Sequence, residues 1–325
     1  MSRLVPAATL LVLATRVDAF GFSSSPTVPD WQQSLEHSPL QPPLATNDLV
    51  CMVGCANPAL LPNDGGQERQ GLLNFHQVLS YTGLAPTGRV LEPGCGYGRN
   101  ARYFGSYLDS KRGGEWHGFD ISRDLVEWGT QNLTSLFPHV IFKYVNVYNE
   151  HYSESNFAFI AHHGGKKRTG DADASAFIFP YSDNYFDAVY APSVWTHLKV
   201  PDALNYLTQV YRVLKPGGQA LINFLFADEH FVLPVMKSVN ENPGMVMFGG
   251  HKRLIPDMPG VTWGPKAGIE GAIMYNLTWM QVECKKIGFQ VGATILGTWA
   301  DTAAGTRWNG IKEYQDRILL KKPTN

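Results

Sequence analysis

The chain has little that would suit a disulfide scaffold or a metal knuckle, because only four cysteines occur in its 325 residues. These are Cys51, Cys55, Cys95 and Cys284, and their spacing lacks the paired pattern of a zinc-binding motif. Cys51 and Cys55 could form a disulfide or half of a metal site, with two unrelated thiols in a loop as the alternative. We therefore predict no metal centre.

An excess of positive charge is also missing. The 27 lysines and arginines are balanced by 28 aspartates and glutamates. A protein that binds nucleic acid broadly needs surplus positive charge to displace counterions from the phosphates. The balance argues against that class of protein, and we expect no nucleic-acid partner.

Long apolar runs are scarce, and the best candidate lies near the N-terminus. Arg3 precedes an apolar stretch over 4–15, Arg16 ends it, and Val17-Asp18-Ala19 places small residues where a signal peptidase reads. The stretch is shorter than the about 20 apolar residues that a membrane span needs. We predict a cleaved signal peptide over 1–19 and no stable membrane span after its removal. An uncleaved anchor or a disordered N-terminus is the alternative.

Residues 20–48 are rich in Ser and Pro and offer little to build a core, so we interpret them as a presequence or linker. A signal peptide followed at once by Phe20 resembles the two-part presequences of algae with secondary plastids. We expect the chain to enter the secretory route. Its destination would be a secondary plastid or, otherwise, the cell exterior or the endomembrane lumen.

From about Gln67 the sequence alternates between helical and strand patterns. Helices are predicted at 67–84, 99–108, 124–137, 201–214 and 277–287. Strands are predicted at 89–92, 115–121, 140–147, 186–191, 219–226, 289–299 and 313–320. Strand–helix alternation predicts a parallel sheet with helices on both faces. The last two strands are joined by a turn-rich loop and should pair antiparallel. The predicted fold is α/β, a Rossmann-like doubly wound sheet of five parallel strands plus a C-terminal antiparallel hairpin.

This domain is predicted over 60–325, with insertions near 149–175 and 237–275 that interrupt the alternation. The first contains His162-His-Gly-Gly-Lys-Lys-Arg168, which suits a solvated loop, with a phosphate or partner site as the alternative. The second is rich in Gly, Pro and Met. It follows the fifth strand, where a lid or a substrate-recognition segment would sit.

The strongest chemical signal is Val90-Leu-Glu-Pro-Gly-Cys-Gly-Tyr-Gly98, between a predicted strand and a predicted helix. Its glycines let the backbone turn tightly and approach a ligand closely. The helix that follows presents free N–H groups and the positive end of its dipole. Asp120 closes the second strand, where a carboxylate can accept hydrogen bonds from ribose hydroxyls. Together they indicate a cofactor that contains adenosine; a loop that only turns the chain is the alternative.

The spacing and charge of this loop narrow the choice of cofactor. Its glycines follow G-x-G-x-G, whereas a pyrophosphate favours G-x-G-x-x-G. Glu92 at the head of the loop would repel a pyrophosphate. It could instead organise water or the cationic amino group of the methionyl part of S-adenosylmethionine (SAM). The spacing, Glu92 and the terminal hairpin all oppose the alternative, a nicotinamide oxidoreductase.

Five stretches resemble the class I SAM-dependent methyltransferases, and the type 11 small-molecule methyltransferases in particular. They are VLEPGCGYGRN (90–100), GFDIS (118–122), FPYSDNYFDAVYAPSVWTH (179–197), YRVLKPGGQALINF (211–224), and GTW with EYQDRIL (297–319). The likeness covers most of 60–235, fades through 236–275 and returns at the C-terminus. It implies transfer of a methyl group from SAM to an acceptor, which we expect to be a small molecule.

The resemblance also implies which residues hold the cofactor. Asp120 would bind the ribose, and Ile121 would pack on the adenine. Asn146 stands where the family often has an Asp near the adenine amine, and its amide oxygen can still accept that N–H. The methionyl part would be cradled by four loop residues: Glu92, Gly94, Cys95 and Gly96.

Two further residues would complete the site, and a third would act on the acceptor. Ser193 would face the cofactor near the transferred methyl, and Arg99 would reach its carboxylate, with a surface position on the helix as the alternative for Arg99. His197 is the best candidate for a general base, which is needed only if the acceptor is protonated. A structural or helix-capping histidine is the alternative. Trp195 could wall the acceptor, although core packing is the default for such a residue.

Two other functions fit the same residues. The chain could bind SAM without turnover, although the intact loop and Asp120 oppose such a loss. It could also modify proteins, since the sequence does not size the acceptor pocket. Fold alone does not decide among acceptors.

Overall fold

A computed structural model describes residues 66–149, 170–226, 261–263, 273–297, 307–308, 311–312 and 315–324. The predicted signal peptide, the linker, Cys51, Cys55 and the histidine- and lysine-rich run at 162–168 lie outside these residues and stay predictions. The same holds for most of the two predicted insertions.

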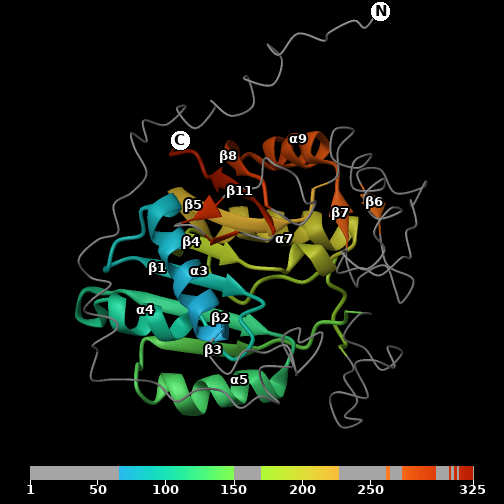
Figure 1. The fold of residues 1–325 in the computed structure, drawn as a ribbon. Helices are drawn as coiled ribbons and strands as arrows, with labels where there is room; N and C mark the ends of the chain where they lie inside the picture. The colour runs from blue at the N-terminus through green and yellow to red at the C-terminus, as the bar shows by residue number, and fades with distance from the viewer. Residues whose placement is uncertain are drawn as a thin grey trace, which may run out of the picture.

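Seven strands form one sheet in the order β3-β2-β1-β4-β5-β11-β8 (Figure 1). The strands are β1 (Arg89–Pro93), β2 (Glu115–Asp120), β3 (Val140–Tyr144), β4 (Phe186–Ala191), β5 (Leu214–Phe224), β8 (Gln290–Ile295) and β11 (Asp316–Lys321). β1 to β5 pair in parallel, and β11 runs antiparallel to both β5 and β8. This arrangement confirms the predicted fold class.

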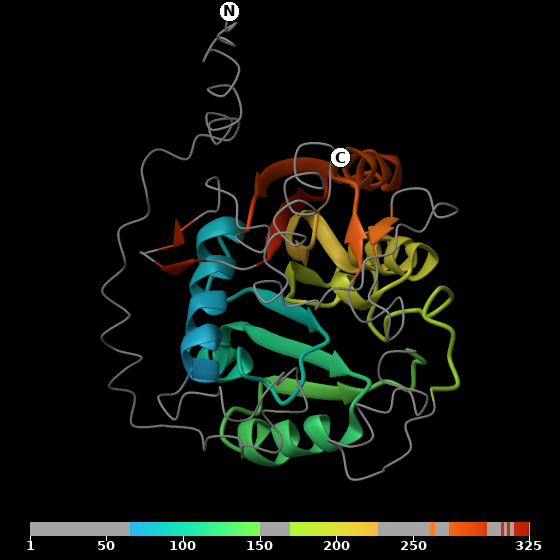
Figure 2. The ribbon, with the colours of Figure 1, turned by 45° about the vertical axis from the view of Figure 1, so that its right-hand side comes forward.

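Helices cover both faces of the sheet, as Figures 1 and 2 show. They are α3 (Gly66–Thr82), α4 (Ala101–Tyr107), α5 (Arg123–Gly129), α7 (Val200–Val213) and α9 (Leu277–Ile287). One buried core joins Phe75 of α3 and Phe104 of α4 to Trp116 of β2. The other joins Tyr206 of α7 and Met280 of α9 to the opposite face. Two cores on one sheet are what right-handed crossovers produce.

Two short strand pairs lie outside the main sheet, and the sequence patterns did not predict them. β6 (Val261–Trp263) pairs antiparallel with β7 (Met274–Tyr275), and β9 (Arg307–Trp308) pairs antiparallel with β10 (Ile311–Lys312). Strands of two or three residues are too short to show an alternating pattern.

The predicted bounds of three elements need correction. The helix predicted at 124–137 is α5 followed by a π-helical segment over Thr130–Thr134. β3 ends at Tyr144 instead of 147, and Val147 forms only an isolated parallel bridge with Ala172. β5 begins at Leu214 instead of 219, because a register shift against β4 lets the Lys-Pro-Gly-Gly turn stay within the paired strand.

The ends of α9 follow the predicted capping residues. The Asn276 side chain accepts a hydrogen bond from the backbone N–H of Trp279, and Gly288 closes the helix in the left-handed region. An amide side chain before the helix and a glycine after it satisfy backbone groups that the helix leaves unpaired.

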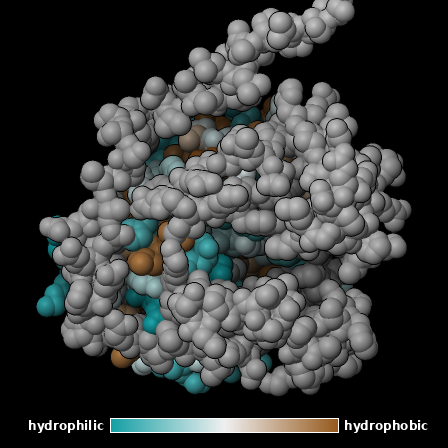
Figure 3. Space-filling model, viewed as in Figure 1, coloured by the Kyte–Doolittle hydropathy of each residue, from teal (hydrophilic) through white to brown (hydrophobic). Residues whose placement is uncertain are grey.

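No helix among the described residues is both long and apolar enough to cross a bilayer. Where described residues are visible in Figure 3, hydrophilic and hydrophobic residues are mixed. The large apolar side chains that are exposed, Leu136, Tyr148, Ile178 and Val282, come from separate segments of the chain. Single exposed apolar residues of this kind are ordinary.

Candidate active site

The sheet order reverses between β1 and β4, which lie side by side. α4, which follows β1, packs into one core, and α7, which follows β4, packs into the other. Ligands of doubly wound sheets bind outside the carboxyl ends of the strands at such a reversal. The candidate site is therefore bounded by the loops after β1, β2 and β4.

The loop after β1 is tightly wound around its glycines. Gly94, Gly96 and Gly98 have φ angles of 67°, 54° and 87°, in the left-handed region that favours glycine. A Cβ atom on Gly94 would lie 2.5 Å from Cγ2 of Val194, in the segment after β4. The loops after β1 and β4 are therefore in contact, and the Gly94 backbone is exposed there.

Asp120 is bonded directly to this loop. Its Oδ2 accepts a hydrogen bond from the Gly96 N–H at 2.8 Å, and its Oδ1 accepts one from the Ser122 N–H at 2.8 Å. The carbonyl of Phe119 accepts from the Gly94 N–H at 2.8 Å. The half-buried carboxylate is thus held at the edge of the sheet, beside the glycine turn with which it was predicted to act.

Glu92 is a buried carboxyl with one bonded oxygen. Its side chain is 2% exposed, and Oε1 accepts a hydrogen bond from Asn100 Nδ2 at 2.6 Å. Oε2 has no hydrogen-bond partner among the described residues. Burial raises the pKa of Glu92 to about 8, although the Asn100 bond, the charge of Arg99 and the indole of Trp116 act in the opposite direction. Without a bound cation this carboxyl is largely neutral at pH 7.

The other predicted residues around the loop differ in burial. Cys95 is buried, and burial raises the pKa of its thiol, so it acts as a small packing residue. A Cβ atom on Gly118 would meet Cys95 Cβ at 2.7 Å, which shows how closely β2 approaches the loop. Arg99 is half-buried, near enough for its charge to act on Glu92. Ile121 is partly buried against the core that contains α7.

Asn146 lies beside an acid, Asp171, that was not predicted as a site residue. Its Nδ2 donates to Asp171 Oδ2 at 2.7 Å, and its Oδ1 accepts from the Tyr144 hydroxyl at 3.0 Å. The Ala172 N–H donates to the Asn146 carbonyl at 3.1 Å. Asp171 lies 25 residues beyond Asn146, inside the first predicted insertion, so no local pattern links the two residues. A negative charge therefore accompanies the neutral amide at this edge.

Ser193 belongs to a polar cluster, which we define as Ser193, Asn223 and Gln315. Ser193 has a φ of 59°, unusual for a residue other than glycine. Its hydroxyl donates to Gln315 Oε1 at 2.9 Å, and Asn223 Nδ2 donates to the same oxygen at 3.1 Å. Asn223 is 5% exposed, and its Oδ1 has no partner among the described residues. Asn223 and Gln315 were not predicted, because 92 residues separate them.

His197 ends a short 3-10 helix, Trp195–His197, after β4. The ring is half-buried, and the His197 carbonyl accepts a hydrogen bond from Asn149 Nδ2 at 2.9 Å. Trp195 is fully buried, and its indole N–H donates to the Ala203 carbonyl at 3.2 Å. Trp195 is therefore a core residue, whereas His197 lies at the carboxyl edge of the sheet.

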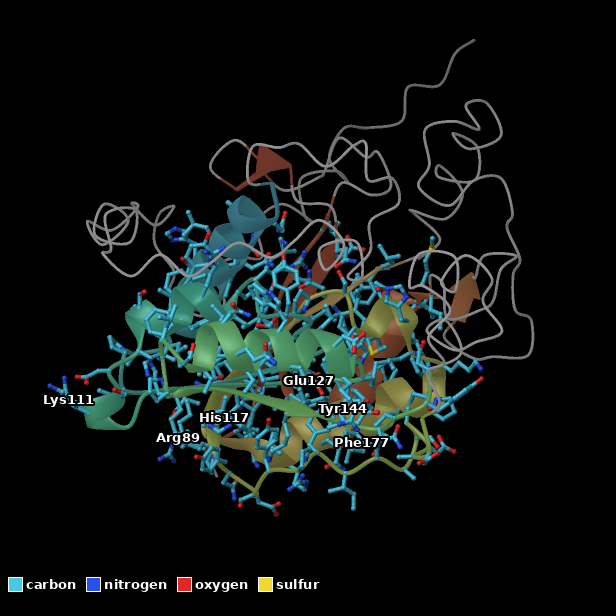
Figure 4. All side chains as sticks on the ribbon, turned by 90° about the horizontal axis from the view of Figure 1, so that it is seen from below. Arg89, Lys111, His117, Glu127, Tyr144 and Phe177 are labelled. Atoms are coloured by element: carbon cyan, nitrogen blue, oxygen red, sulfur yellow. The ribbon has the colours of Figure 1, made fainter. Side chains whose placement is uncertain are left out.

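A second polar group, around Glu115, lies away from this site. Figure 4 shows Arg89 and His117 toward one end of the sheet and Tyr144 and Phe177 toward the other. Glu115 Oε2 lies 3.3 Å from Arg89 Nε and 3.0 Å from His117 Nε2. Glu115 and Arg89 begin β2 and β1, so this group sits at the amino edge, opposite the glycine loop. Across the described residues, no three His, Cys, Asp or Glu side chains gather as a metal site would require.

The fold and the site define a class of protein: a doubly wound methyltransferase-like sheet with a glycine loop and an acid at its carboxyl edge. Residues 91–222 match the family model described as a methyltransferase domain. That span runs from β1 into β5 and contains the glycine loop, Asp120 and Ser193. The matched residues make a methyltransferase domain, as the resemblance predicted, with SAM as its cofactor.

Solved structures with a related fold include two methyltransferases. A SAM-dependent methyltransferase from Aquifex aeolicus is 16% identical, with a TM-score of 0.43, over 80% of this chain and 94% of that one. The 1,6-didemethyltoxoflavin-N1-methyltransferase of Burkholderia thailandensis was solved with 1,6-didemethyltoxoflavin and S-adenosylhomocysteine. It is 13% identical, with a TM-score of 0.45, over 88% of this chain and 94% of that one.

Proposed function

We propose that this methyltransferase acts on a small molecule that binds beside the polar cluster. The observation that carries the proposal is Asn223 Oδ1, near the end of β5. It is a buried hydrogen-bond acceptor without a partner among the described residues. An unsatisfied buried polar group costs about 1–3 kcal/mol. A substrate that donates an N–H or O–H hydrogen bond to Asn223 Oδ1 would recover that free energy.

The residues at the loop fit the chemistry of SAM. Glu92 Oε2 is a buried oxygen without a partner, suited to an ammonium group, and the exposed Gly94 backbone permits close approach. On this basis Asp120 would bind the ribose and Ile121 would cover the adenine. Asn146, with Asp171 beside it, would meet the adenine amine. The methionyl part would be held by Glu92, Gly94, Cys95, Gly96 and Arg99.

When bound, SAM supplies a methyl group on a cationic sulfur, which needs little further activation. The protein must align the acceptor and exclude water, and alignment can contribute roughly 7–11 kcal/mol. Because Val194 lies against Gly94, the segment that carries Ser193 adjoins the cofactor loop. His197, three residues beyond Val194, would take the proton from a phenol or amine acceptor.

Incubation of the purified chain with methyl-labelled SAM and a metabolite extract, followed by mass analysis, tests the proposal. Label in a low-mass product supports it. Label found only on protein would instead indicate a protein-modifying enzyme. SAM binding without any labelled product would indicate a chain that keeps its cofactor but has lost turnover.

The variant His197→Ala tests the general base once a product is known. A base of this kind contributes typically about 10²–10⁴-fold, so kcat should fall by that factor while the affinity for SAM stays unchanged. An unchanged kcat and pH profile would remove His197 from the mechanism.

A further inference from the structure

A line of buried side chains connects α3 to the cofactor loop. Gln70 Nε2 donates to Asn74 Oδ1 at 2.9 Å, Asn74 Nδ2 donates to Asn100 Oδ1 at 3.0 Å, and Asn100 Nδ2 donates to Glu92 Oε1 at 2.6 Å. Asn74 is 2% exposed and Asn100 is fully buried. The line starts in a helix that precedes the matched span 91–222 and ends at Glu92, inside it.

The bonds in this line fix one another. Because Asn100 Oδ1 accepts from Asn74, its Nδ2 must face Glu92. Asn74 is oriented in turn by the donor of Gln70. Without Asn74, the Asn100 amide could rotate and present its oxygen to Glu92. The orientation of the Glu92 carboxyl therefore depends on a residue of α3 that it does not touch.

α3 is also seated directly on the loop. A Cβ atom on Gly71 would lie 2.4 Å from the Arg99 carbonyl oxygen, so the helix and the loop touch through their backbones. At its other end, α3 is held separately, because Gln219 Nε2 donates to the Thr82 carbonyl at 3.0 Å. This second attachment does not pass through Asn100.

We propose that Asn74 and Asn100, with Gln70 at the outer end, form a positioning relay through which α3 orients Glu92 toward the ammonium group of SAM. The proposal rests on the proposed role of Glu92 in cofactor binding. The relay residues act through Glu92, and their effect should appear in the pH dependence of binding as well as in affinity.

The charges around Glu92 set the direction of that pH dependence. Asn100, Arg99 and the indole of Trp116 favour the carboxylate, whereas burial and the charge of Asp120 favour the neutral acid. The Cys95 thiol also lies near Glu92. On the neighbouring strand β4, Tyr190 comes directly after Val189, which pairs with Leu91, the residue before Glu92. Because its pKa is about 8, Glu92 must lose a proton to pair with an ammonium group at neutral pH. Loss of the Asn100 donor should raise that pKa further.

Isothermal titration of the full chain with SAM, between about pH 6 and 9 and in buffers of different ionisation enthalpy, tests the relay. The wild type should release protons on binding at neutral pH. Asn100→Leu should weaken SAM binding by about tenfold or more at neutral pH. It should also raise the midpoint, which is the pH at which the change in SAM affinity is half complete. Asn74→Leu should shift both quantities in the same direction by a smaller amount.

Gln219→Met is the matched control, because it removes a bond that holds α3 without passing through Glu92. It should lower the melting temperature and leave the affinity and the midpoint unchanged. The relay would be overturned if all three variants weakened SAM binding equally. It would also be overturned if Asn100→Leu and Asn74→Leu bound SAM like the wild type. If Asn100→Leu does not fold, the SAM affinity of Asn74→Leu and the proton release of the wild type test the relay instead. A wild type that does not bind SAM would contradict the proposed function itself.

Discussion

Two carboxyl groups at the candidate site meet different surroundings. Asp120 is half-buried, and each of its oxygens accepts a backbone N–H. Glu92 is buried, with one amide donor and one oxygen that has no partner among the described residues. Asp120 thus braces the loop through two backbone bonds, whereas one oxygen of Glu92 is left available for a further donor.

Asp120→Ala should weaken SAM binding by about tenfold or more. The variant removes an ionised acceptor, and hydrogen bonds to charged groups are worth about 1.5–3 kcal/mol. Titration calorimetry measures the change. Asp173→Ala is the control, because Asp173 also accepts a backbone N–H, from Ser175, but lies on an exposed turn. Equal affinity of the two variants would contradict a role for Asp120 in the site.

Glu92→Gln should make the cofactor-free protein more stable at high pH than the wild type. The pKa of Glu92 is raised from 4.5 to about 8 in the fold, so the native state holds the proton more tightly than the unfolded chain. Its contribution to stability is therefore complete below about pH 4.5 and is lost as the pH rises through about 8. Glutamine has no proton to lose.

Urea unfolding of both proteins at several pH values measures this difference. The gap in unfolding free energy should widen between about pH 5 and 8, by up to about 1.4 kcal/mol for each unit of pKa shift. A constant gap over that range would mean that Glu92 is not held neutral in the fold.

At the scale of elements, the contact between α3 and the glycine loop is a tight constraint on the site. The helix carries the start of the relay, and its Gly71 leaves no room for a side chain against Arg99. The loop also touches the segment after β4, at Val194. A helix outside the matched family span therefore contacts the loop that we propose to hold the cofactor.

Gly71→Ala should destabilise the fold by about 1–3 kcal/mol, the usual range for overpacking, and should weaken SAM binding. The added methyl would force α3 away from the loop. Thermal unfolding and titration calorimetry measure the two effects. Gly83→Asn is the matched control at the other end of the helix, because Gly83 has a positive φ that asparagine tolerates, with nothing within 4 Å of an added Cβ. If Gly71→Ala left both stability and SAM affinity unchanged, the close contact between α3 and the glycine loop would be contradicted.

At the scale of the whole molecule, the C-terminal strands complete the sheet. β11 enters between β5 and β8, and buried Asp316 joins all three segments. Its Oδ2 accepts from the Phe226 N–H at 2.7 Å, and its Oδ1 accepts from the Gly297 N–H at 2.6 Å. The same strand end brings Gln315 to Asn223, so the polar cluster depends on this closure.

Asp316→Ala should lower the free energy of unfolding by about 2–5 kcal/mol, because two N–H groups near the core would lose their acceptor. Asp183→Ala, which breaks an exposed ion pair with Arg212, should cost less than about 1 kcal/mol. Urea unfolding compares the two variants. Similar values would show that Asp316 does not hold the strand ends together.

Much of this fold could be predicted because its signals are local. The periodicity of the strands, the Asn276 and Gly288 caps of α9 and the G-x-G-x-G loop each lie within a short stretch. Asp120 could be paired with the loop because one βαβ unit separates them and the carboxyl ends of parallel strands share an edge. Local propensity does not reveal the irregular start of β5, because pairing with β4 produces it.

The sequence by itself determined the class of fold, the glycine loop and the acid that faces it, because backbone conformation and hydrophobic period are written in neighbouring residues. Only the tertiary structure decided that Asn100 and Asn74 lead from α3 to Glu92, that Asp171 returns to Asn146, and that Gln315 meets Ser193. Those pairs lie as far as 122 residues apart. Such contacts depend on the order in which strands enter the sheet, which no short pattern of residues records.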